Sequence, residues 1–179
     1  DEEGVLLDNV QLVREGTLLV DEAEALFAGG KYPTRNFHHN LGDLKAQIAA
    51  NEKGVQELHR MVEHFSLDVV KAYMQHVQDN AEEAVRRVID TLTDGSFEYE
   101  TDYGAIIKVV LSVDRKARTA RIDFTGTSDQ QPNNFNAPSA ICVAATLYVF
   151  RTLVDDDIPL NAGCLKPLDI VIPEGCMLN

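Results

Sequence analysis

The chain has 179 residues, of which 45% are hydrophobic and 25% are charged, as in an ordinary globular protein, so a chain disordered throughout is excluded. The 29 acidic residues outnumber the 16 basic ones, and the formal charge of −13 argues against nucleic acid or an anionic membrane as a partner. The three cysteines include no C-x-x-C pair, which argues against a disulfide framework and favours a reducing, cytoplasmic setting.

The termini of the chain indicate a piece of a longer protein. The sequence starts at Asp1 without a methionine, and a strand expected to begin at Cys176 has no evident partner before the chain stops. The longest apolar stretch, residues 137–150, is shorter than the roughly 20 residues that a membrane-spanning helix needs. We therefore expect a single excerpt of a larger domain, with no membrane span and no signal peptide.

The first half of the chain is expected to be helical. Residues 1–39 read as an extended lead-in with one short helix over residues 22–27. Residues 40–93 then carry apolar side chains at spacings of three, four and seven, with a break at Ser66, which predicts two long helices. We expect these helices to pack antiparallel as a hairpin.

Two details of the first long helix follow from its sequence. Asn40 is the expected N-cap, because asparagine accepts hydrogen bonds from the free N–H groups of a first turn. Gly54 lies within the apolar stripe, where glycine costs about 1 kcal/mol relative to alanine. Its presence predicts a kink or a close contact with another element.

The second half of the chain, residues 96–179, is expected to contain a small sheet. Alternating and β-branched runs at residues 97–100, 105–113 and 119–124 are separated by short turns, and they predict a three-stranded antiparallel meander. A further helix is expected from Pro138 to about residue 153, followed by a short closing strand at residues 168–172. The predicted fold class is α+β.

An amide-rich loop is the first candidate site. Asn133, Asn134 and Asn136 crowd four positions just before the expected helix, and Asn136 is its expected cap. Asparagine often builds turns by bonding its own backbone, so a turn and a helix cap would explain these residues. The alternative is a pocket wall lined with amide donors and acceptors, and the sequence leaves both readings open.

A second polar group enters and follows the first long helix. Near-helical spacing places most of its members on one face, where a solvated face, a buried structural network and a ligand-facing surface all remain open. The group consists of Arg35, Asn36, Asn40, Asp43, Gln47 and Asn51.

Three further features have weaker functional readings. His38 and His39 precede the helix, but they lack the three or four ligands that a metal site needs, so no metal site is predicted. The run at residues 155–157 consists of three aspartates, which fit a solvated helix end better than a cation site. Cys164 is more simply a small buried hydrophobic residue than a nucleophile, because no activating base is close in sequence.

Three long runs carry a family resemblance. They are N-L-G-D-L-K-A-Q-I-A-A-N-E-K-G from residue 40, T-G-T-S-D-Q-Q-P-N-N-F-N-A-P from residue 125, and V-F-R-T-L-V-D-D-D-I-P-L-N-A-G-C-L-K-P-L from residue 149. Together they resemble the hydantoinase B/5-oxoprolinase family, and the resemblance extends over nearly the whole chain.

The resemblance implies part of an ATP-dependent enzyme that opens a cyclic amide such as 5-oxoproline or a hydantoin. It implies that ATP is handled by a partner A-type subunit or domain, and that a divalent metal is bound in the complete, oligomeric enzyme but not by this excerpt. The excerpt alone is then expected to be inactive. If the substrate is a small lactam that carries a carboxylate, Arg35 and the three asparagines are the expected substrate-binding residues. Arginine binds carboxylates through two hydrogen bonds, and an asparagine amide can donate to and accept from the lactam amide. The alternative is a non-catalytic scaffold and subunit-interface segment of a related ketone carboxylase or hydrolase.

Overall fold

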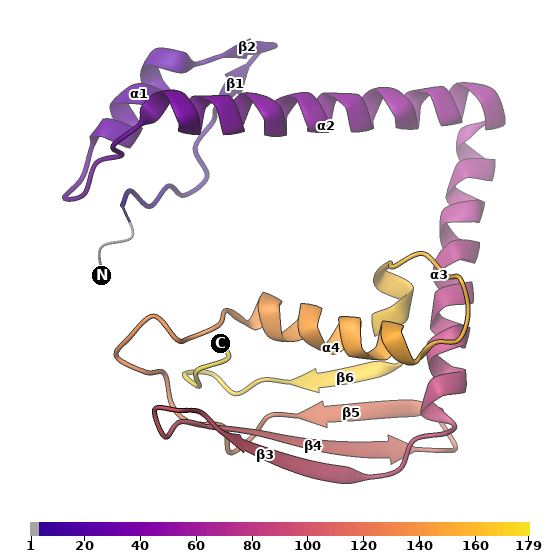
Figure 1. Cartoon of the computed structure of the whole chain (residues 1–179). Coiled ribbons are helices and arrows are strands. Elements are labelled where there is room, and N and C mark those ends of the chain that lie inside the picture. The colour runs from indigo at the N-terminus through magenta and orange to yellow at the C-terminus, as the bar shows by residue number, and fades with distance from the viewer. Residues whose placement is uncertain (1–3) are drawn as a thin grey trace. The chain divides into compact units, whose positions relative to one another are not determined.

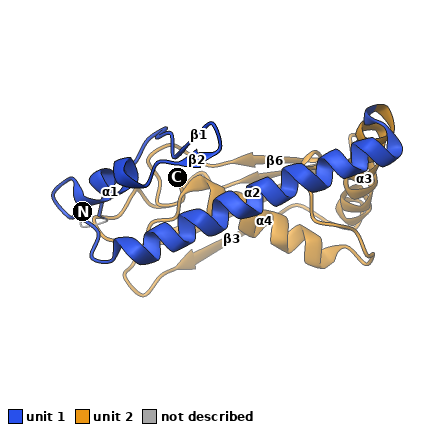
Figure 2. Ribbon diagram, turned by 90° about the horizontal axis from the view of Figure 1, so that it is seen from above, with its two compact units in different colours: residues 1–67 blue, residues 68–179 orange. Residues whose placement is uncertain are grey.

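The computed structural model describes residues 4–179, which fall into two compact units that meet at Leu67 and Asp68 (Figures 1 and 2). The chain is mixed α and β, as predicted.

The first unit contains a small hairpin and two helices, drawn in blue in Figure 2. Strands β1 (Val13–Arg14) and β2 (Thr17–Leu18) pair antiparallel around Glu15 and Gly16, both of which have positive φ, as a tight hairpin turn requires. Helix α1 (Val20–Ala28) follows. The ring of Phe27, in α1, lies 5.9 Å from that of Phe37, the first residue of α2 (Phe37–Phe65).

The expectations about the start and middle of α2 were wrong. Asn36, not Asn40, is the N-cap, and its Oδ1 accepts a hydrogen bond from the backbone N–H of His39 at 3.4 Å. Asn40 lies one turn into the helix, where its Oδ1 accepts from the Thr34 hydroxyl at 2.9 Å. The helix runs without a break through Gly54, and a side chain there would meet nothing within 4 Å. Gly54 therefore marks neither a kink nor a close contact.

Helix α3 (Leu67–Ile89) begins after the predicted break, because Ser66 has a φ of 72° and ends α2. None of the α2 residues is buried, whereas α3 is buried along its second half, from Ala81 to Ile89. The antiparallel packing of the two helices stays a prediction.

The second unit is built on a four-stranded sheet in the order β3-β4-β5-β6. Strands β3 (Gly95–Glu100), β4 (Ile106–Asp114) and β5 (Thr119–Asp123) form the predicted antiparallel meander. The closing strand β6 (Leu168–Val171) was expected, but its pairing was not predicted. It pairs with β5 in parallel and adds a fourth strand to the sheet. Helix α4 (Ser139–Leu153) and the 3-10 helix η1 (Ala162–Leu165) lie in the connection between β5 and β6, which is long enough for a parallel crossover.

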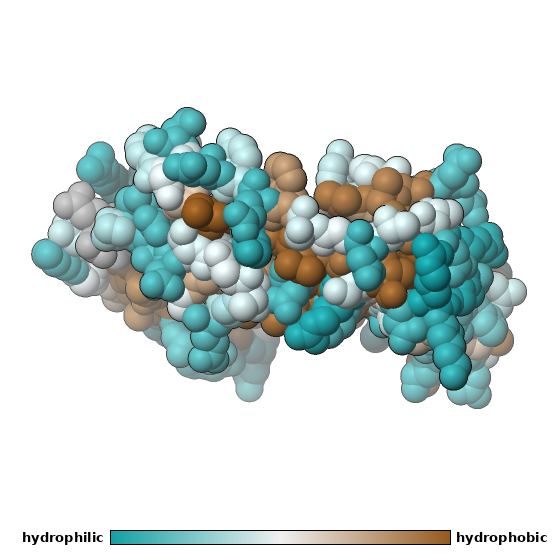
Figure 3. All heavy atoms as spheres, turned by 90° about the horizontal axis from the view of Figure 1, so that it is seen from below, coloured by the Kyte–Doolittle hydropathy of each residue, from teal (hydrophilic) through white to brown (hydrophobic). Residues whose placement is uncertain are grey.

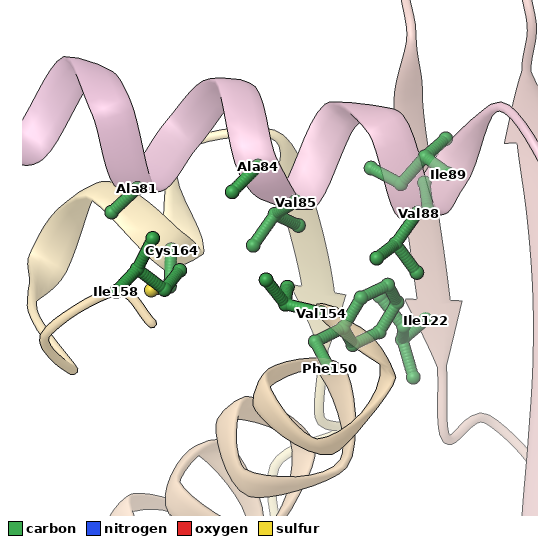
Figure 4. Close-up of a cluster of buried hydrophobic side chains, with 11 residues drawn as sticks. Ala81, Ala84, Val85, Val88, Ile89, Ile122, Phe150, Val154, Ile158 and Cys164 are labelled. Carbon is green, nitrogen blue, oxygen red and sulfur yellow. The ribbon is translucent and has the colours of Figure 1, made fainter. Parts of the chain in front are cut away.

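One face of the sheet forms the core of the second unit. Side chains from the buried half of α3 and from the end of α4 meet Ile122 of β5, as Figure 4 shows. Ala120, also in β5, belongs to the same cluster. Val85 and Ile89 are completely buried there. Cys164, in η1, is equally buried in the same cluster.

An ion-pair cluster joins α3 to the β4–β5 turn. The Arg118 guanidinium donates to Glu83 at 3.0 Å and to Asp90 at 2.9 Å. The hydrogen bond and positive charge of Arg118, against a smaller opposing effect of desolvation, hold the pKa of Glu83 below its ordinary value. Because the folded-state pKa is lowered, this pair stabilises the fold above the unfolded-state pKa and stops doing so as the pH falls through the folded-state pKa.

We therefore expect Arg118→Ala to weaken the second unit at neutral pH and to lessen its loss of stability on acidification. Urea unfolding followed by circular dichroism between about pH 7 and pH 3 measures both effects. Lys116→Ala, in the same exposed turn, removes a charge outside the cluster and is the control. Equal acid-side slopes for Arg118→Ala and the parent chain would contradict the expectation.

Candidate functional site

The amide-rich loop is stabilised by its own side chains. The Asn136 Oδ1 accepts from the Gln131 backbone N–H at 2.8 Å, and its Nδ2 donates to the backbone carbonyls of Gln131 and Asn133, each at 2.9 Å. The expectation that Asn136 caps the following helix was wrong: Pro138 is the N-cap of α4 and makes no side-chain cap bond. Asn136 fixes the loop's shape because its amide is already bonded on both sides.

The other two asparagines keep polar groups available. The Asn133 Oδ1 accepts from the Phe135 backbone N–H at 2.9 Å, a local turn that leaves its Nδ2 without a hydrogen bond among the described residues. Asn134 is exposed, and its side chain likewise makes no hydrogen bond within residues 4–179. The loop therefore contains one structural amide and two that can meet a ligand.

The C-terminal segment holds the loop in place. The Gln130 N–H donates to the Gly175 carbonyl at 2.8 Å, and the Ala137 N–H donates to the Met177 carbonyl at 2.8 Å. The strand expected to begin at Cys176 without a partner is instead a single antiparallel bridge from Cys176 to Asp129. The segment thus closes back onto the loop and buries Cys176 and Met177.

A hollow of about 310 Å³ lies between this loop and the β3–β4 turn. The rings of Tyr103, in the turn, and Phe135, in the loop, are tilted by 32° with centroids 5.0 Å apart, and both side chains are more than half exposed. Gly104, with a φ of 79°, allows the turn to bring Tyr103 to this position. The hollow is lined by Tyr99, Thr101, Asp102, Tyr103, Ala105, Ile107, Gln131, Asn133, Phe135 and Met177.

The chemistry of the hollow suits a small, flat, polar molecule. Aromatic rings offer flat apolar surface, and the Asn133 amide adds a hydrogen-bond donor. The lining includes the carboxylate of Asp102 but no lysine or arginine. A cation that grips a substrate carboxylate would therefore have to come from outside the hollow.

Arg35, the predicted cation, belongs to the first unit, in the exposed segment before α2. The loop belongs to the second unit. The joint site of Arg35 with Asn133, Asn134 and Asn136 accordingly stays a prediction.

The polar group along α2 divides by role. Asn36 and Asn40 make the local bonds described above, at the cap and to Thr34. Asp43, Gln47 and Asn51 are exposed and make no hydrogen bond within the described chain. No buried network forms from them, so a solvated or ligand-facing surface remains.

Within residues 4–179, the structure places no partner group beside the weaker candidate residues that would make a catalytic or metal site of them. His38 and His39 are exposed in the first turn of α2, and the aspartates at 155–157 are exposed beyond α4. No group of three histidine, cysteine, aspartate or glutamate residues that could hold a metal ion occurs in the described chain. Cys164 lies fully buried beside α3, where no substrate can reach its thiol.

The aromatic half of the hollow was not predicted from the sequence. Tyr99, Tyr103 and Phe135 were treated as strand, turn and loop residues, yet the structure gathers them around one hollow. An exposed aromatic at the tip of a turn was the available signal, because large apolar groups at loop tips often contact ligands.

Comparisons with known proteins agree with the resemblance. The family model for hydantoinase B/oxoprolinase matches residues 1–179, so the chain belongs to this family. It is 45% identical to the 5-oxoprolinase PfmaA of Pestalotiopsis fici and 40% identical to the 5-oxoprolinase of Dictyostelium discoideum, in each case over 99% of this chain. The chain spans 15% and 14% of those relatives' lengths, respectively.

A solved structure shares the fold. The ATP-dependent caprolactamase of Pseudomonas jessenii superposes with a TM-score of 0.76 at 20% identity, over 99% of this chain and 31% of its own.

In the described part of the chain, no helix is both long enough and apolar enough to cross a membrane.

Proposed function

We propose that this chain is the B-type part of an ATP-dependent enzyme that opens a cyclic amide, with 5-oxoproline as the first substrate to test. The observation that carries the proposal is the family match over the whole chain together with 5-oxoprolinase relatives at 40–45% identity. The likeness to the ATP-dependent caprolactamase concerns the fold, and caprolactam is a further lactam to test.

Within that enzyme, we assign the hollow beside the amide-rich loop to the substrate side. The amide group of a lactam is planar, and it needs one donor and one acceptor from the protein. Asn133 offers an amide there, and Tyr103 and Phe135 offer flat faces for the ring. Asn134 is the next residue in the same exposed loop.

ATP and a divalent metal are part of the proposed reaction, but the residues described here do not form a place for them. The sequence has no G-x-x-x-x-G-K-[ST] phosphate loop, and no metal-binding cluster occurs in residues 4–179. We therefore assign both to an A-type subunit or domain of the complete enzyme. The 179-residue chain alone is expected to be inactive.

The complete enzyme that carries this segment provides the test. We expect ATP-dependent release of the ring-opened amino acid from 5-oxoproline, hydantoin or caprolactam, followed by chromatography, with 5-oxoproline the best of the three. Reactions without ATP and with the 179-residue chain alone are the controls. Turnover of none of the three rings, or ring opening that does not need ATP, would contradict the proposal.

A scaffold role is the second candidate, because Asn136 is committed to shaping its own loop. In that case the segment would belong to a related hydrolase or ketone carboxylase and hold its subunits together. Loop substitutions would then lower assembly or stability and leave the turnover of assembled enzyme unchanged.

A further inference from the structure

Helix α2 carries a seven-residue repeat that its own unit does not bury. The eight positions of the repeat are spaced alternately by three and four residues throughout. Seven of them are apolar, and the eighth is an asparagine. This stripe consists of Leu41, Leu44, Ile48, Asn51, Val55, Leu58, Val62 and Phe65. A strict repeat of this kind is the pattern of a coiled-coil seam, with alternate members at the a and d positions.

Most side chains in the second half of the stripe are exposed, so no element of the described chain covers them. Val55, Leu58 and Phe65 are 49%, 44% and 53% exposed, and Met61 beside them is 44% exposed. The first residues of the stripe are half-buried, near the contact of α1 with Phe37. Apolar atoms, in brown, also reach the surface in Figure 3, which looks from below, from the side where Figure 1 draws β3 of the second unit. An unpaired helix face of this kind has a strong tendency to bind another apolar surface.

We propose that the stripe on α2 pairs with α2 of a second copy of the chain, as a parallel two-stranded coiled coil. The a positions are Leu41 and three β-branched residues, Ile48, Val55 and Val62, and Leu44 and Leu58 occupy d positions, the combination that favours two parallel strands. Asn51 decides the orientation. In a parallel pair it faces Asn51 of the other copy, and each amide supplies the donor and acceptor that the other needs.

The alternatives use the same stripe less well. In an antiparallel pair with full overlap, Asn51 lies across from Val55, and the two Glu52 carboxylates come to the same side near the middle. The hairpin expected from the sequence would need the stripe of α3 along its whole length. Ala81, Ala84 and Val88 of that stripe are already buried in the core of the second unit. In the first half of α3, Val70 is buried as well, and the exposed part from Tyr73 to Val77 is too short to cover the stripe on α2.

Sedimentation equilibrium of the 179-residue chain, from about 5 to 500 µM, tests the pairing, because a homodimer dissociates on dilution. We expect a monomer–dimer equilibrium in the parent chain. Leu58→Lys places a charge in the seam and should shift the dimer to monomer at every concentration. Ala46→Lys adds the same charge at an exposed position outside the stripe and should leave the equilibrium within about twofold of the parent. Neither position is buried, so folding is not at risk.

Cysteine cross-linking tests the orientation. Leu58→Cys places two thiols face to face in a parallel dimer, whereas an antiparallel dimer places residue 58 near Ile48 of the other copy. We expect a covalent dimer from Leu58→Cys on mild oxidation, and none from Ala46→Cys or from the parent, whose three cysteines are buried. A chain that stays monomeric over the whole range, or equal cross-linking of Leu58→Cys and Ala46→Cys, would overturn the proposal.

Discussion

Replacing Gly163 by alanine is expected to lower the free energy of unfolding of the second unit by about 3 kcal/mol, at the upper end for overpacking. The backbone of η1 passes so close to α3 that an added Cβ would overlap the backbone carbonyl oxygen of Gln78. It would also lie 2.7 Å from the Gln78 carbonyl carbon and 2.8 Å from the Asn161 Oδ1. Two of these atoms belong to the helix backbone, so no side chain can swing aside to make room.

Thermal unfolding followed by circular dichroism measures this effect. A unit of this size should lose roughly 10–20 °C in its midpoint for such a change. Gly95→Ala is the matched control, because a Cβ there meets nothing within 4 Å and its effect should stay within about 0.5 kcal/mol. Equal midpoints for Gly163→Ala and the parent would show that η1 moves away from α3 at no cost.

The need for glycine at position 163 could not be predicted from the sequence. The run of residues 161–164 reads as an ordinary polar turn, and only the packing of η1 on α3 explains the glycine. The parallel pairing of β6 with β5 was hidden for the same reason: it joins segments nearly fifty residues apart. Hydrophobic periodicity predicted that α2, α3 and the meander exist, because each pattern is local.

The caps were misplaced for a local reason. Asn36 and Asn40 both precede apolar helical residues, and sequence alone does not say which one has the extended backbone of an N-cap. In the candidate site, the amides could be found because they lie within four positions of the sequence. The aromatic wall is a weaker signal, because Tyr103 comes from a turn about thirty residues earlier. Ser128, whose Oγ accepts from the Ile106 N–H at 2.9 Å, helps to hold that turn against the loop.

Changing Asn133 to aspartate in the complete enzyme is expected to lower kcat/KM for 5-oxoproline by about 100-fold, the cost of losing one well-placed donor. Aspartate keeps the Oδ1 that accepts from the Phe135 N–H, so the loop keeps its turn. The substitution replaces only the Nδ2 donor at the hollow, and it adds a negative charge that repels a carboxylate-bearing substrate. Asn134→Asp changes the second available amide and should also lower kcat/KM.

Two controls separate a site from a scaffold. Asn80→Asp, an exposed asparagine on α3 that does not line the hollow, makes the same chemical change and should keep kcat/KM within about twofold. Asn136→Ala removes three local hydrogen bonds and should lower the unfolding midpoint, because the loop loses its internal support.

The kcat/KM for 5-oxoproline of the Asn133→Asp enzyme, compared with Asn80→Asp at equal folded and assembled protein, tests the assignment of the hollow most directly. A loss of about 100-fold in Asn133→Asp, with Asn80→Asp within about twofold of the parent, is the result we predict. Equal kcat/KM values for the two variants would contradict it and would make the loop a scaffold element.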